Sequence, residues 1–132
     1  MWTAETVLVC ALALLPRESN GFPPVVLLDT RPADVSVNAE GFVRHGDPRI
    51  YLLTDSPSFR RARRAGDRCG ELQALRKIAS IVVHEEWHVR HPGDERGAYD
   101  AQRTALLAAG AAPGNPLLVE VQRSMRTALR WP

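Results

Sequence analysis

The spacing of apolar residues changes along the chain and predicts strands first and helices later. Val25–Leu28 and Ile50–Thr54 are short apolar runs bounded by turn-forming residues, and each predicts a buried strand. Apolar and polar residues alternate at 35–37 and again at 41–44, which predicts a further short strand or a hairpin. Between the first apolar run of the chain and these strands, Pro16–Pro24 predicts a loop because it is rich in turn residues.

The second half of the chain has helical spacing. Apolar residues recur every three or four positions from Leu72, and Ile78–Val83 is apolar nearly all round, which predicts a central helix covered on several sides. His91-Pro92-Gly93 ends that helix, and Asp94–Gly110 predicts the next one. A last amphipathic helix is expected over Leu117–Leu129, ending at Trp131.

These elements predict an α+β domain. Three short strands followed by helices fit a small three-stranded sheet packed beside a central helix, with one N-terminal helix and two C-terminal helices. The chain of 132 residues is long enough for one such domain, spanning 1–132, and too short for two. Its 45% hydrophobic and 24% charged residues exclude a disordered chain.

The formal net charge of +2 is small and gives little reason to expect a nucleic-acid partner. Arginines concentrate in Arg60–Arg64, after a Ser56-Pro57 pair that favours a short helix. Such a cluster can contact phosphates, but we expect it to be the exposed face of that short helix. Nothing in the sequence indicates the oligomeric state.

The apolar run Val7–Leu15 has the length of a signal-peptide core, yet no Lys or Arg precedes it and Glu5 does. It is too short to span a bilayer, so we expect no membrane span. Thr3 or Thr6 can cap a helix there and Pro16 can end it, which favours a buried N-terminal helix. Location is left open, with the cytoplasm slightly favoured.

Cys10 and Cys69 are the two cysteines, too few for a multi-bridge scaffold or a four-cysteine zinc site. They can pair in one way only, and the default expectation is two separate thiols in a reducing compartment. A disulfide is the alternative, and Cys10 as a cap on a metal ion is a more remote one.

The clearest chemical motif is His84-Glu85-Glu86-Trp87-His88. In a helix, H-E-x-x-H places both imidazoles one turn apart on the same face, where they can hold one zinc ion. Glu85 then lies roughly 100° round the helix and can approach a metal-bound water without being a ligand. Two nitrogens, a third protein ligand and a water form the usual set of a hydrolytic zinc site.

Glu95 is the preferred third metal ligand, because it follows the Pro92-Gly93 turn on a helix that can fold back against the first. Asp94 is its chief competitor, and Asp100 and His91 are weaker ones. The alternative for Glu95 is a first-turn acid that the helix dipole favours. We expect His91 to be an exposed helix-end cation and His45 to lie on the surface.

The remaining residues of the motif region have secondary roles. Glu85 is the expected general base, which takes a proton from water and delivers it to the leaving amine. Glu86 is assigned a structural or solvent role, and Trp87 is expected in the core. Asp100 and Gln102 are candidates to accept the second ring N–H of a ligand histidine.

Residues 75–102 resemble the core of a zincin metallopeptidase of the gluzincin type, as in the single-domain minigluzincins. That type has H-E-x-x-H on one helix and a ligand glutamate in an E-x-x-A pattern on a following helix, and His84, Glu85, His88, Glu95 and Ala98 stand at those positions. By spacing alone, Asp94 falls at the third-ligand position of a metzincin-like pattern, but His91 replaces its glycine.

The resemblance implies a zincin-like fold and a strand before the motif helix that pairs with an extended peptide substrate. Tyr51–Thr54 is the candidate for that edge strand, and Tyr99 for a transition-state donor. The expected function is therefore a zinc-dependent metallopeptidase that acts on a peptide or protein. The alternatives are a metal-binding zincin-like domain without catalysis, and a nucleic-acid-binding or protein-binding module that uses Arg60–Arg64.

Overall fold

The computed structural model describes residues 1–17 and 21–130. The predicted loop Pro16–Pro24 and the predicted helix end at Trp131 therefore lie partly or wholly outside the described residues. Within them the fold is α+β, as predicted. Its helices and strands are α1 (Ala4–Leu12), β1 (Val25–Leu28), β2 (Gly41–Val43), β3 (Ile50–Leu53), α2 (Pro57–Arg63), α3 (Leu72–Arg90), α4 (Glu95–Ala108) and α5 (Pro116–Leu129).

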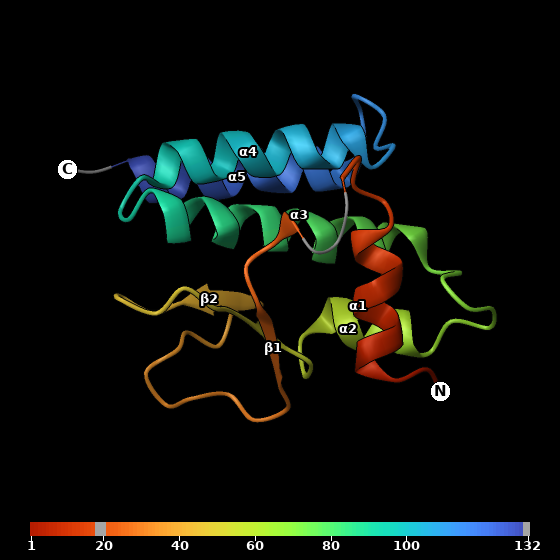
Figure 1. Cartoon of the computed structure of the whole chain (residues 1–132). Coiled ribbons are helices and arrows are strands. Elements are labelled where there is room, and N and C mark those ends of the chain that lie inside the picture. The colour runs from red at the N-terminus through yellow and green to blue at the C-terminus, as the bar shows by residue number, and fades with distance from the viewer. Residues whose placement is uncertain (18–20, 131–132) are drawn as a thin grey trace.

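Helix α3 is the centre of the fold. It lies between the sheet on one side and α4 and α5 on the other, and α1 and α2 pack along its N-terminal half (Figure 1). Ile78, Ala79 and Val82 are almost fully buried, which is why this stretch of the sequence is apolar nearly all round. This confirms the predicted layout, in which a sheet lies beside a central helix, with one N-terminal helix and two C-terminal helices.

The sheet has the order β1-β3-β2, with β1 parallel and β2 antiparallel to β3. The expectation that Tyr51–Thr54 forms an edge strand is therefore wrong, because β3 is the central strand. Ile50, Leu52 and Leu53 are at most 1% exposed, which fits a central strand whose two faces are both covered. The edge strand that contacts α3 is β2, whereas the alternating residues 35–37 form turns instead of a strand.

The apolar run near the N-terminus forms α1, as the buried-helix interpretation predicted. Thr3 caps this helix by accepting a hydrogen bond from the Thr6 backbone N–H, and Val7 and Ala11 are buried in the main core. Among the described helices none has the length and apolar character that crossing a membrane requires. Arg60, Arg61 and Arg64 lie on the exposed side of α2, as expected for a solvated helix face.

Cys10 and Cys69 form a disulfide, so the expectation of two separate thiols is wrong. The bridge joins α1 to the loop before α3, because α1 packs across that loop and brings the two Cα atoms to 5.4 Å. Sequence spacing gave no sign of this packing. Cys10 is consequently held in the bridge, which contradicts its more remote role as a cap on a metal ion.

Removing the disulfide is expected to destabilise the domain. The bridge closes a loop with a sequence separation of 59, and in the chain-entropy treatment this stabilises the folded state by about 4 kcal/mol. The double variant Cys10→Ser, Cys69→Ser should therefore unfold at a clearly lower urea concentration than the wild type. Unchanged midpoints for the wild type with and without reductant would contradict this prediction.

Candidate metal centre

His84 and His88 lie one turn apart on α3 and point to the same side of the helix. Their ring centroids are 5.0 Å apart, with the planes at 65° to each other. The side chains are only 13% and 15% exposed, because α4 packs over this end of α3. The helical spacing of the motif thus produces the pair of neighbouring imidazoles that the sequence predicted.

Glu95 reaches the same place from the first turn of α4. The chain reverses direction between α3 and α4 through Gly93, whose φ of 80° is a conformation that glycine adopts without strain. Glu95 Oε1 then lies 2.6 Å from His88 Nε2 and 3.4 Å from His84 Nε2. One ligand atom from each of these three residues lies within 4.8 Å of the others.

This donor set could hold a metal ion. Two imidazole nitrogens and a carboxylate oxygen are ligands that zinc takes in catalytic sites, and a tetrahedral site places its donors about 3.3 Å apart. The distances from Glu95 Oε1 to the two ring nitrogens, 2.6 and 3.4 Å, lie on either side of that value. Among the described residues no other group of at least three His, Cys, Asp or Glu side chains has this geometry.

Asp94, the competing ligand, points elsewhere. It is the N-cap of α4, where its carboxylate accepts hydrogen bonds from the Gly97 backbone N–H at 3.1 Å and from Trp87 Nε1 at 2.9 Å. These bonds, that of Trp87 first, hold the pKa of Asp94 below its ordinary value. The structure therefore places Glu95, and not Asp94, beside the two histidines.

Trp87 does not lie in the core, contrary to expectation. It is half-buried, donates to Asp94 and stacks on the exposed His91 ring with centroids 4.1 Å apart. An indole needs a hydrogen-bond acceptor for its N–H, and Asp94 provides one at the start of α4. A Cβ at Gly97 would overlap the side chains of Trp87 and Asp94, so a glycine is required where these two side chains meet.

Gln102 fixes the orientation of His84, and Asp100 does not take part. The Gln102 amide nitrogen donates to Ser80 Oγ at 3.2 Å, which turns its carbonyl oxygen toward His84 Nδ1 at 2.9 Å. The histidine must then donate from Nδ1, which leaves the lone pair of Nε2 on the side of Glu95. Asp100 is exposed on the other side of α4 and lines a different surface.

Glu85 is buried beside this cluster, with 8% of its surface exposed, and its carboxylate forms no hydrogen bond with any described residue. Burial, with the nearby charge of Glu95, raises its pKa to about 8. Glu86, the next residue, is also buried but pairs with Arg17 and Arg90, which agrees with its expected structural role.

A cleft of about 230 Å³ opens next to Glu85 and His84. Tyr99 stands at its edge, with its ring 4.7 Å from the His84 ring, and burial followed by the charges of Glu95 and Glu85 raises the pKa of its phenol. The far end of the cleft contains Lys77, which sequence reasoning missed. The sequence spacing could have indicated this position, because Lys77 precedes His84 by seven residues, which is two helical turns along the same face.

Comparison with known proteins gives no family for this chain. No family model, no curated protein and no solved structure matches it. The site must therefore be interpreted from its own atoms. These are a His-His-Glu cluster able to hold a metal ion, a buried carboxylate next to it, and a cleft that leads to both.

The raised pKa of Glu85 predicts that the metal-free protein loses stability as the pH rises. Between the ordinary value of 4.5 and about 8, the folded state holds a proton at Glu85 that the unfolded chain has released. The stability difference between Glu85→Gln and wild type should therefore increase over this window, by on the order of a few kcal/mol in favour of the variant. Urea unfolding of both proteins in chelator at several pH values checks this, and a constant difference would contradict it.

Proposed function

We propose that this protein is a zinc-dependent metallopeptidase. The observation that supports it best is the His84, His88 and Glu95 cluster, whose ligand atoms lie within 4.8 Å of one another beside the buried Glu85. A structural zinc site has four protein ligands, whereas this set of three leaves one position open, as in hydrolytic sites. The resemblance of residues 75–102 to gluzincins supports the same conclusion.

Zinc bound by this set would act as a Lewis acid toward water and toward the carbonyl of the scissile bond. Glu85 acts as general base, because it is buried next to the ligands and has no protein partner among the described residues, and a bound cation would lower its pKa from the metal-free value of about 8. It accepts a proton from the attacking water and later donates it to the leaving amine. Gln102 holds His84 in the tautomer that leaves Nε2 for the metal.

Edge strand β2 is the proposed place for the substrate backbone. The Leu53 N–H donates to the Glu40 carbonyl, and Gly41 pairs with Leu52 in the antiparallel register. The alternation of antiparallel hydrogen bonds then turns the N–H and C=O groups of Gly41 and Val43 away from β3. An extended peptide can pair with these groups and pass the metal centre. The cleft beside His84 lies at the Gly41 end of this strand.

Tyr99 is the proposed donor to the oxyanion of the transition state. Its ring packs against His84, and its phenol forms no hydrogen bond with the described residues. Because burial raises its pKa, the phenol stays protonated and able to donate at neutral pH.

The ligand assignment predicts which variants lose zinc. His88→Ala and Glu95→Ala should purify with little zinc, compared with about one ion per chain in the wild type. Asp94→Ala is the matched control, because its carboxylate caps α4 and should leave the zinc content nearly unchanged. Metal analysis by mass spectrometry after dialysis checks this. Zinc retained by Glu95→Ala but lost by Asp94→Ala would reverse the assignment.

Peptidase activity is the decisive test of function. Zinc-loaded wild type should cleave members of a mixed peptide library, and a chelator should abolish the cleavage. Glu85→Gln should keep its zinc and lose activity by about a hundredfold or more, because it lacks the proton acceptor. Absence of any chelator-sensitive cleavage by a zinc-loaded protein would refute the proposal.

The role of Tyr99 is tested separately with Tyr99→Phe. Removal of one oxyanion donor should lower kcat by about a hundredfold with little change in KM. An unchanged kcat would leave the tyrosine with a packing role only.

A further inference from the structure

We propose that the cleft beside the metal centre selects substrates with a basic side chain, lysine or arginine, next to the scissile bond. This inference rests on the proposed peptidase function and extends it to the substrate class. It is based on the shape of the cleft and on the charges at its far end.

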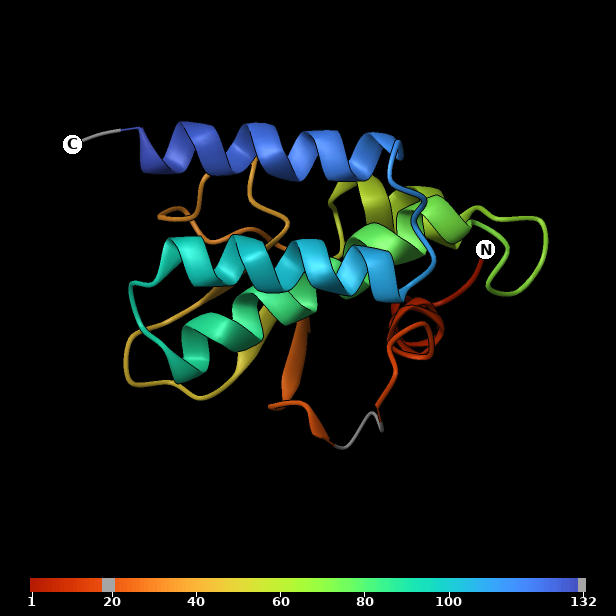
Figure 2. The same cartoon turned by 90° about the horizontal axis from the view of Figure 1, so that it is seen from above.

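The cleft begins at the metal centre and runs along α3 away from it. His84 and Glu85 line its beginning, and Lys77 lies at the far end, two turns earlier in the helix. The start of β2 forms one wall of the cleft. Helix α5, which runs beside α4 (Figure 2), forms another. A side chain of a substrate bound along β2 that points into this cleft therefore extends from Glu85 toward Lys77.

The far end of the cleft has one negative charge in excess. Lys77 Nζ lies 2.8 Å from Glu40 Oε2 and 2.6 Å from Glu120 Oε1. Among the described residues no other cation lies within ion-pair distance of either carboxylate. Burial lowers the pKa of Lys77, but the hydrogen bonds with Glu120 and Glu40 raise it further, so the lysine stays charged. Two carboxylates and one ammonium sum to a charge of −1.

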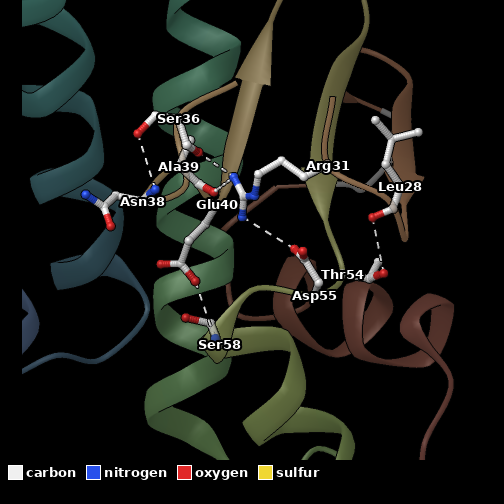
Figure 3. Close-up of polar contacts among 9 residues, drawn as sticks. All are labelled: Leu28, Arg31, Ser36, Asn38, Ala39, Glu40, Thr54, Asp55 and Ser58. Carbon is white, nitrogen blue, oxygen red and sulfur yellow. Dashed lines mark hydrogen bonds and ion pairs between the residues drawn. The ribbon is translucent and has the colours of Figure 1, made fainter. Parts of the chain in front are cut away.

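Glu40 is held in place, as Figure 3 shows. Its Oε1 accepts from the Ser58 backbone N–H at 3.4 Å, and its side chain is only 12% exposed. Arg31 braces the loop that carries it, because its Nη1 donates to the carbonyls of Ser36 and Ala39 at 2.6 and 2.7 Å. This carboxylate is therefore a fixed charge, whereas that of Glu120, half exposed on α5, can turn toward a ligand.

The walls between the two ends carry aliphatic side chains among polar ones. They include Ile81 on α3, Leu106 on α4, and Leu117 and Val121 on α5. The volume of about 230 Å³ is below the range of roughly 300–1,000 Å³ that is usual for pockets of larger ligands, so it suits one long side chain. Lysine and arginine have an aliphatic stem for such walls and a cationic head for the carboxylates.

An acidic side chain fits less well. Lys77 already binds two carboxylates, so a third would add to the excess negative charge. A purely aliphatic side chain would match the walls but would displace water from Glu120 without replacing its hydrogen bonds. The charges thus favour a cation over both.

The test uses capped hexapeptides of alanine with one central variable residue, which is arginine, norleucine or glutamate. With zinc-loaded wild type, kcat/KM should be about tenfold higher for arginine than for norleucine, and lowest for glutamate. Glu120→Gln should reduce the preference for arginine over norleucine by about threefold or more. The matched control is Glu5→Gln, the same change at an exposed position of α1, which should leave the preference unchanged.

Binding is measured in parallel, with fluorescently labelled versions of the same peptides and the zinc-loaded Glu85→Gln variant. The order of affinity should again be arginine, norleucine, glutamate. If no peptide is cleaved but this order holds in binding, the proposed peptidase function fails and the cleft assignment stands. Cleavage or binding that favours glutamate or norleucine over arginine overturns the inference. A preference for arginine that Glu120→Gln does not reduce overturns it as well. The peptidase proposal survives either result.

Discussion

The close approach of α3 and α4 is the constraint on which the candidate site depends. The two histidines are on one helix and Glu95 is on the other, so the cluster exists only if the helices meet at the turn between them. Ala98 is 0% exposed at this contact, and the absence of a side chain at Gly97 makes room for the bond between Trp87 and Asp94. That bond ties the end of one helix to the beginning of the next, and so fixes the direction from which Glu95 approaches.

Burial of polar groups at this contact works against stability and shifts the pKa values of those groups. Glu85 loses most of its hydration and gains no hydrogen bond from the described residues, which is why its proton is held to unusually high pH. Burial also lowers the pKa of His84, with a further contribution from His88, and this favours the neutral imidazole that a metal ion requires. A positive ion at this place would compensate for the negative charges of Glu85 and Glu95.

Local patterns predicted the parts of the protein that local geometry determines. The period of the motif helix placed His84 and His88 together, and the turn after it made Glu95 reachable. Features that depend on contacts between distant segments could not be predicted. The order of strands puts β3 in the centre, and the bridge from Cys10 to Cys69 follows from how α1 crosses the loop before α3. The same holds for the far end of the cleft, since Glu40 and Glu120 meet Lys77 from two separate elements.

The packing of α5 has a consequence for access to the cleft. This helix rests chiefly on α4 through a small apolar cluster of its own, formed by Leu106, Ala111, Leu117, Leu118 and Val121, apart from the main core. Two polar ties, Lys77 to Glu120 and Gln73 to Asn115, join it to α3. Because this cluster is separate from the main core, α5 can detach by local opening without exposing the main core. Such opening would widen the cleft without moving His84 and His88, so the size of the cleft and the geometry of the His84, His88 and Glu95 cluster can vary independently.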